Sequence, residues 1–155
     1  MGGENEAAES HVLRPPRDAA EWSAYHAIRR RAIFETYLPD VAYDPDHPDE
    51  KGPGRRSLVL VTEGEIVGTV RVDLLDDERA ALRLVAIDPD RQGEGHGSVL
   101  LRLVEDVIRA EGRRRVVLHG NPETVGFYLA NGYAEAPWLD DVSMAGEHID
   151  LAKEL

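Results

Sequence analysis

The spacing of apolar residues predicts alternating strands and helices along most of the chain. Short apolar or alternating runs predict strands over 11–14, 57–62, 65–75, 79–87 and 115–119, with a weaker last strand over 142–151. Apolar residues three or four positions apart predict helices that follow Asp18, His96 and Pro122. This order is typical of a mixed α/β (α+β) domain with a mostly antiparallel sheet.

The same patterns predict which faces are buried. The first helix, which Pro39 ends, carries an apolar stripe at Trp22, Tyr25, Ile28, Ala32, Ile33 and Tyr37. We expect this stripe to face the sheet and Arg29–Arg31 to lie on the outer side. The strand over 65–75 alternates apolar residues with polar or small ones, so we expect one of its faces to be exposed.

Glycine dominates the turn between the strand over 79–87 and the next helix. After Asp88 and Pro89, glycines occupy the alternate positions Gly93, Gly95 and Gly97. Glycine lets the backbone approach a ligand closely, and unpaired N–H groups at a helix N-terminus attract negative charge. The pattern predicts an anion site, for a phosphate or pyrophosphate. A strand on each side of this helix also predicts one parallel pair within the sheet.

Two common nucleotide-binding patterns do not fit this segment. A Walker loop needs Gly-Lys followed by Ser or Thr, whereas Gly97 directly precedes Ser98. A Rossmann fingerprint needs G-x-G-x-x-G after the first strand, and counting from Gly93 places Ser98 at the third glycine position. The segment also comes late in the chain, with few strands after it. Neither nucleotide-binding pattern therefore accounts for it.

Length and composition are those of one domain, which we expect over residues 11–155. The chain has 155 residues, of which 42% are hydrophobic. Residues 1–10 are small and acidic, so we expect a disordered tail. No apolar run is long enough to span a membrane, and the first residues lack the parts of a signal peptide. We expect a cytoplasmic protein, and the absence of cysteine excludes disulfides and a cysteine nucleophile.

The net charge of −12 argues against binding to nucleic acids or anionic membranes. It favours a cationic partner slightly, although acidic residues also keep a surface solvated. The loop over 40–56 concentrates Asp44, Asp46, His47, Asp49 and Glu50. This loop does not match a calcium-binding loop, because Pro48 takes the fifth position and Asp49 the place of the required glycine. We expect no metal site.

Two blocks of residues resemble the GNAT superfamily of N-acetyltransferases. The segment 92–97 (QGEGHG) resembles that family's acetyl-CoA motif, Q/R-x-x-G-x-G/A, and follows a strand and a proline turn. The family's block N-x-x-A-x-x-F-Y-x-x-x-G-F is matched by Asn121, Thr124 (for alanine), Phe127, Tyr128, Gly132 and Tyr133 (for phenylalanine). The resemblance covers nearly the whole chain. It implies a single GNAT-fold domain with a splayed parallel pair of strands around the acetyl-CoA loop.

The resemblance also implies roles for individual residues. The backbone of the glycine turn would hold the pyrophosphate of acetyl-CoA, the strand end would pair with the pantetheine arm, and the second block would line the thiol end. The residues expected to contact acetyl-CoA are Val85, Ala86, Ile87, Gln92, Gly93, Glu94, Gly95, His96, Gly97, Ser98, Asn121, Phe127 and Tyr128.

For catalysis, an amine would attack the thioester directly. We expect Tyr128 to stabilise or protonate the leaving thiolate, because a phenol is protonated at neutral pH. An N–H donor near Ile87 would stabilise the oxyanion. The attacking amine must be neutral, so a base is expected. The candidates are Glu35, Asp73, His119 and His148, and Glu35 ranks first because it ends the helix that usually covers the acceptor site.

These expectations describe an N-acetyltransferase that moves the acetyl group of acetyl-CoA to a primary amine of a small molecule or peptide. A non-catalytic acyl-CoA-binding module or sensor is the alternative. The sequence does not identify the acceptor, and a homodimer is left open.

Overall fold

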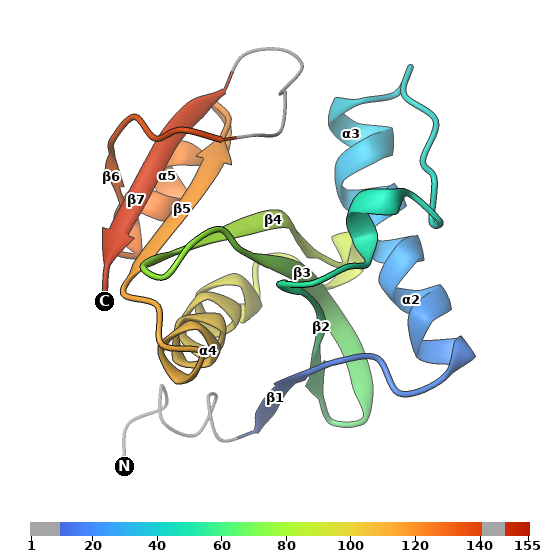
Figure 1. Cartoon of the computed structure of the whole chain (residues 1–155). Coiled ribbons are helices and arrows are strands. Elements are labelled where there is room, and N and C mark those ends of the chain that lie inside the picture. The colour runs from blue at the N-terminus through green and yellow to red at the C-terminus, as the bar shows by residue number, and fades with distance from the viewer. Residues whose placement is uncertain (1–9, 141–147) are drawn as a thin grey trace.

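A seven-stranded sheet organises the chain, with strands in the order β1-β2-β3-β4-β5-β7-β6 (Figure 1). The computed structural model describes residues 10–140 and 148–155, so nearly all of the expected tail lies outside the described residues. The strands are β1 (His11–Arg14), β2 (Arg55–Thr62), β3 (Glu65–Leu74), β4 (Arg79–Ile87), β5 (Arg115–Gly120), β6 (Ala134–Glu135) and β7 (Ile149–Glu154). All neighbouring strands pair antiparallel except β4 and β5, which are parallel. This confirms the mixed sheet with one parallel pair.

Helices cover both faces of the sheet (Figure 1). On one face, α4 (His96–Ala110) buries Leu100, Val104 and Ile108 against apolar strand residues, and α5 (Val125–Ala130) contributes Tyr128 to the same core. On the other face, α2 (Ala19–Arg29) packs against β3 and β4. Short helices η1 (Arg30–Phe34), α3 (Glu35–Tyr37), η2 (Pro48–Glu50) and η3 (Pro89–Arg91) complete the described elements.

The first helix contains a π-helical segment that the periodic pattern did not predict. After α2, the chain continues as η1, in which the backbone N–H of Glu35 donates to the carbonyl of Arg30. A π turn holds more residues than an α turn, so it shifts the phase of the apolar stripe. Tyr25 and Ile28 before it are buried, whereas Tyr37 after it is 44% exposed. The expected burial of Tyr37 was therefore wrong.

Three other expectations about burial and boundaries were also wrong. The strand β3 is buried on both faces, because α2 covers the side that carries Thr69, Arg71 and Asp73. Arg29 is also buried, with 3% exposure, although we expected it on the outer side of its helix. The last strand begins at Ile149 and runs to Glu154, beyond the expected end. The expected start of this strand, 142–147, lies outside the described residues.

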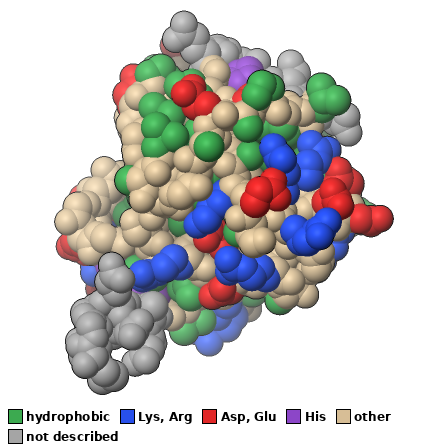
Figure 2. Space-filling model, turned by 90° about the vertical axis from the view of Figure 1, so that its left-hand side faces the viewer, with side chains coloured by type: hydrophobic (Ala, Val, Ile, Leu, Met, Phe, Trp, Pro, Cys, Tyr) green, Lys and Arg blue, Asp and Glu red, His purple; other side chains and the backbone are tan. Residues whose placement is uncertain are grey.

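The surface beyond β6 and β7 mixes charges of both signs. Figure 2 shows Lys and Arg side chains interspersed with Asp and Glu across the middle of this face. Exposed ion pairs of the protein include Arg115 with Glu154 and Arg114 with Glu78. No field of a single sign therefore covers this face. Within the described residues, no helix is long and apolar enough to cross a membrane.

Candidate active site

The glycine turn forms an open cradle at the N-terminus of α4. Gly93 and Gly95 have φ angles of 80° and 86°, a left-handed conformation that favours glycine, and Gly95 directly precedes the helix. A β-carbon added at either glycine would meet no atom within 4 Å, so the space around them is open. Residues 92–95 are exposed. The first turn of α4 directs backbone N–H groups into this space, which suits an anion.

Two side chains of the cradle, Glu94 and His96, form hydrogen bonds with other protein groups. The Nε2 of His96 lies 2.8 Å from Oε1 of Glu94, and its Nδ1 lies 2.9 Å from Nε2 of His11 on β1. Arg91 donates to the same oxygen of Glu94 at 2.9 Å. These bonds to Arg91 and His96 lower the pKa of Glu94. Because the charges of Glu94 and Arg91 compensate, the backbone remains the main binding group for an anion here.

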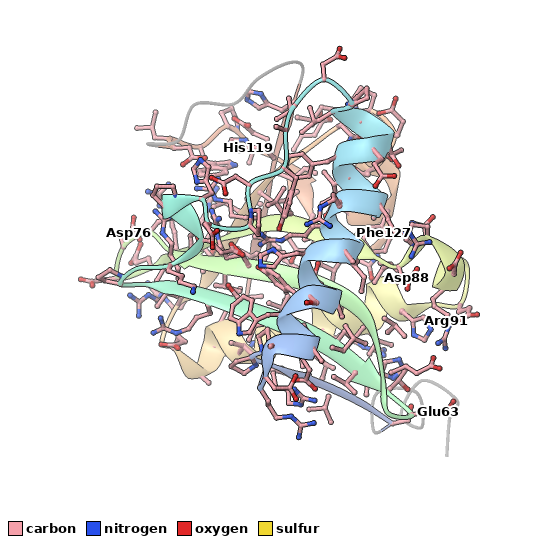
Figure 3. The ribbon with its side chains drawn as sticks, turned by 90° about the vertical axis from the view of Figure 1, so that its right-hand side faces the viewer. Glu63, Asp76, Asp88, Arg91, His119 and Phe127 are labelled. Carbon is pink, nitrogen blue, oxygen red and sulfur yellow. The ribbon has the colours of Figure 1, made fainter. Side chains whose placement is uncertain are left out.

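The cradle adjoins the strand end and the second sequence block. The Nε2 of Gln92 donates to the carbonyl of Ile87 at 3.2 Å. A β-carbon at Gly97 would lie 3.0 Å from the ring of Phe127, so only glycine lets this ring pack so closely against α4. Figure 3 shows Phe127 and His119 at separate positions, with Asp88 and Arg91 in the turn before α4. The structure thus brings Ile87, the glycine turn and Phe127 together.

Next to the cradle, the parallel pair of strands parts. Pairing between β4 and β5 runs from Arg79–Arg115 to Leu82–Leu118. The remainder of β4, including Val85, Ala86 and Ile87, continues without a described partner on that side. The indole Nε1 of Trp138 donates to the carbonyl of Leu118 at 3.1 Å and so occupies the end of the ladder. This confirms the splayed pair and leaves polar backbone groups of β4 for a ligand.

A bulge in β4 accompanies the separation of the strands. The register to β3 shifts between Thr69 and Arg71, so that two residues, Leu84 and Val85, lie opposite Val70. Leu84 has a φ of 51°, which is unusual for a residue with a side chain. Such strained positions occur often at functional sites. Nothing in the sequence marks this bulge, because no glycine occupies it.

The second sequence block places Tyr128 in the core and Asn121 at a helix start. Tyr128 is only 7% exposed, its ring lies beside Phe127 and Tyr133, and burial raises its pKa. The side-chain oxygen of Asn121 accepts from the backbone N–H of Thr124 at 2.9 Å, and the hydroxyl of Thr124 accepts from the N–H of Asn121 at 3.1 Å. This reciprocal pair fixes the start of α5.

A row of buried charges crosses the sheet on the face away from α4. Arg29 pairs with Glu50 at 2.7 Å, and Glu50 also accepts from Arg71 at 3.5 Å. Arg71 makes two hydrogen bonds to Asp73, of 2.8 and 3.0 Å, and Arg83 donates to Asp73 at 3.1 Å. Burial alone would lower the pKa of Arg71, but its hydrogen bond and charge interaction with Asp73 outweigh it and raise that pKa.

The row continues onto β5 and β7. Arg83 makes two hydrogen bonds to Asp140, of 2.6 and 2.9 Å. Asp140 lies 2.8 Å from Nε2 of His119, whose Nδ1 lies 2.8 Å from Asp150. Arg71 and Arg83 face each other in register, as do His119 and Asp150, so adjacent strands carry the row. Alternating signs let the sheet bury these charges.

The four candidate bases differ in their burial and in the number of charged groups that contact them. Asp73 is buried and lies within ion-pair distance of Arg55, Arg71 and Arg83. His119 has a carboxylate at each ring nitrogen. Glu35, in contrast, is exposed and lines an open pocket of about 300 Å³ together with Arg30, Phe34 and Tyr43. His148 is exposed and lies beside Asp150.

Sequence reasoning missed the partners Arg71, Arg83, Asp140 and Trp138. A signal existed for two of them, because Arg71 and Arg83 interrupt otherwise apolar strands. A long charged side chain in a buried strand needs a buried partner, which is a reason to search for carboxylates. Asp140 and Trp138 lie outside regular elements, so their positions follow from tertiary contacts and not from a local pattern.

A family model matches most of this chain. Residues 21–133 match the model of the acetyltransferase (GNAT) family. A mycothiol acetyltransferase from Thermomonospora curvata is 38% identical over 66 residues, which make up 43% of this chain and only 22% of that protein. The ribosomal-protein-S18-alanine N-acetyltransferase from Escherichia coli gives a TM-score of 0.70 at 20% identity and covers 93% of both chains.

A further solved structure contains bound coenzyme A. The PaiA N-acetyltransferase from Thermoplasma acidophilum, in complex with coenzyme A, gives a TM-score of 0.72 at 15% identity. The alignment covers 94% of this chain and 99% of that one. At these identities the solved structures show a shared fold.

The buried row of charges leads to a prediction about stability. Replacing Asp73 by alanine leaves Arg71 and Arg83 without their shared carboxylate, and we expect a loss of about 3–5 kcal/mol in the free energy of unfolding. The matched control is Asp106→Ala, which removes an exposed partner of Arg109 and should cost less than about 1 kcal/mol. Urea denaturation of both variants measures the difference. Equal losses in the two variants would contradict the assignment of Asp73 to a buried row of paired charges.

Proposed function

This chain belongs to the GNAT acetyltransferase family, and from that premise we propose that it transfers the acetyl group of acetyl-CoA directly to a primary amine. The observation that carries the proposal is the position of an open anion cradle at the start of α4, beside the point where β4 and β5 part. Acetyl-CoA combines a pyrophosphate with an arm rich in amides. It therefore suits a cradle of N–H groups next to an unpaired strand edge.

The cradle is proposed to hold the pyrophosphate through the backbone N–H groups of residues 92–98. The conformation of Gly93 and Gly95 supports this role, because side chains there would enter the open space. The bonds from Arg91 and His96 to Glu94 reduce the repulsion between its carboxylate and a phosphate. The side chain of His96 points toward His11 and acts by holding the turn in place.

Val85, Ala86 and Ile87 are proposed to pair with the pantetheine arm along the free edge of β4. The end of the parallel ladder at Leu82 and Leu118 supports this, since the backbone beyond it needs a hydrogen-bond partner. Phe127 lines the neighbouring space, where it packs against Gly97. Asn121 fixes the start of α5 and thereby positions Phe127 and Tyr128.

Acetyl-CoA supplies the activated acyl group and a thiol leaving group. We assign Tyr128 to the stabilisation of that sulfur by hydrogen bonding. Burial raises the pKa of Tyr128, so its phenol stays protonated at neutral pH and retains a donor. A thiol has a pKa of about 8.5, so complete proton transfer from this phenol would be uphill. An N–H near Ile87 is assigned to the oxyanion, and positioning of the two reactants supplies most of the rate.

Glu35 is proposed as the base that removes a proton from the acceptor ammonium, acting through water. It lines an open pocket with aromatic and basic neighbours, Phe34, Tyr43 and Arg30. An alkylammonium has a pKa of about 10.4, so it must lose a proton before it attacks. Asp73 and His119 serve this role less well, because their polar atoms already bind charged partners.

The acceptor class is a primary amine of a small molecule or a peptide. The net charge of −12 slightly favours a cationic acceptor. Binding to nucleic acids or membranes is not part of the proposal. A cytoplasmic location and a homodimer remain predictions.

The proposal is tested by the release of free coenzyme A from acetyl-CoA in the presence of single primary amines. The panel contains a polyamine, an aminoglycoside, an amino acid, a peptide N-terminus and a lysine side chain. At least one amine should release thiol faster than the hydrolysis background. Stabilisation by acetyl-CoA in a thermal melt without release by any amine would favour a sensor. A melting temperature that acetyl-CoA does not change would contradict the proposal that acetyl-CoA binds as the acyl donor.

Gly95→Glu is expected to weaken the binding of acetyl-CoA strongly, because it puts a carboxylate into the cradle. Repulsion near a helix N-terminus should weaken the affinity by about tenfold or more. The matched control is Gly112→Glu at the other end of α4, since Gly112 also has a positive φ, of 79°, and open surroundings. Isothermal titration calorimetry measures both variants. An affinity of Gly95→Glu within about twofold of the parent would refute the cradle.

Tyr128→Phe is expected to lower turnover by about tenfold or more while the affinity for acetyl-CoA changes little. The reason is that the phenol contributes after the donor is bound, when negative charge develops on sulfur. Tyr133→Phe is the control, because Tyr133 is also buried but its hydroxyl donates to Glu105 in the core. Steady-state kinetics at saturating amine distinguish the two. Unchanged turnover in Tyr128→Phe would remove Tyr128 from the mechanism.

A further inference from the structure

Three possible metal ligands converge where β5 meets β7. Nδ1 of His119 lies 2.8 Å from Oδ1 of Asp150, and Nε2 of His148 lies 3.5 Å from the same oxygen. The ligand atoms of these three residues all lie within 4.8 Å of one another. No other group of three such residues was found in residues 10–140 and 148–155. We propose that His119, His148 and Asp150 bind one Zn²⁺ ion.

The distances fit such a site. Zinc binds imidazole nitrogen and carboxylate oxygen at about 2.0–2.2 Å, so tetrahedral ligand atoms lie about 3.3 Å apart. The two separations from the oxygen of Asp150, 2.8 and 3.5 Å, bracket that value. Both imidazole nitrogens therefore face the same carboxylate oxygen of Asp150. A cation between the three atoms satisfies all of them at once.

Neighbouring residues form hydrogen bonds to two of the ligands, His119 and Asp150, as is typical of zinc sites. Asp140 lies 2.8 Å from Nε2 of His119, and Arg83 fixes Asp140 with two hydrogen bonds. A proton on Nε2 would be donated to this carboxylate and would leave Nδ1 for a metal, an arrangement that recurs around zinc-binding histidines. The other oxygen of Asp150 accepts from the backbone N–H of Trp138 at 3.4 Å. Trp138 also stacks on the His119 ring at 4.3 Å between centroids.

The site has room for a further ligand. An open pocket of about 350 Å³ is lined by His148, Ile149 and Asp150 from the β7 side and by Ala136 and Pro137. Zinc sites with three protein ligands commonly take water as the fourth. The ligand set favours Zn²⁺ over Mg²⁺ or Ca²⁺, because those ions prefer oxygen ligands while two of the three ligands here are imidazoles. This proposal departs from the sequence expectation of no metal, which considered only the loop over 40–56.

Isothermal titration of the metal-stripped full-length chain with Zn²⁺, in the absence of acetyl-CoA, tests the proposal independently of acetyl transfer. We expect one Zn²⁺ per chain. His148→Gln should weaken binding by at least about tenfold, since even residues that only support a ligand contribute that much. The side chain of His148 is 36% exposed, so this variant should keep the fold. His47→Gln in the acidic loop is the matched control and should bind as the parent does.

Two further measurements make the result decisive. Asp150→Asn should weaken Zn²⁺ binding as His148→Gln does, with melting temperatures recorded to verify folding of both. Co²⁺ in place of Zn²⁺ should give the visible absorption of a tetrahedral site, and this absorption should be lost in His148→Gln. Absence of binding would overturn the proposal. So would several weak equivalents that His148→Gln leaves unchanged, or an equal loss in His47→Gln.

Discussion

Pairing between β4 and β5 stops after Leu82 and Leu118, and the rest of the candidate site is positioned by that interruption. Beyond it, the free edge of β4 leads directly into the glycine turn and the start of α4. The bulge at Leu84 bends the strand at this point. A continuous ladder would satisfy the same backbone groups internally and leave none for a ligand. The proposed acetyl-CoA site therefore depends on backbone hydrogen bonds that the sheet does not make.

The buried charges connect the two strands beyond their last backbone pair. Arg83 on β4 reaches Asp140, which in turn reaches His119 on β5. Side chains thus connect the two strands where their backbones no longer pair. Such a connection is directional, because the guanidinium of Arg83 binds the carboxylate of Asp140 through two hydrogen bonds. It links Arg83 on β4 to His119 on β5 beyond the last backbone pair.

Local patterns predicted the elements well and their environments less well. The strand from Arg79 to Ile87 and the cradle beside it follow from an apolar run, a proline and three glycines, all of which act within a few residues. The burial of Arg71 and Asp73 could not be predicted in this way, because it depends on α2 packing over β3. Asp140 and Trp138 reach His119 across some 20 residues of chain. Contacts of this kind come from the tertiary fold, and the spacing of residues in the sequence does not predict them.

The π-helical turn at Arg30–Phe34 gives one helix two differently oriented faces. Before the turn, Tyr25 and Ile28 pack on the sheet, whereas Phe34 at the end of the turn and Glu35 directly after it line the open pocket. A regular helix over the same residues would continue a single stripe and rotate Glu35 away from its present direction. The additional residue in this turn therefore separates the orientation of the part of the helix that packs on the sheet from that of the part that lines the pocket. Deleting one residue there would restore the α-helical phase and change the pocket without altering any residue that lines it.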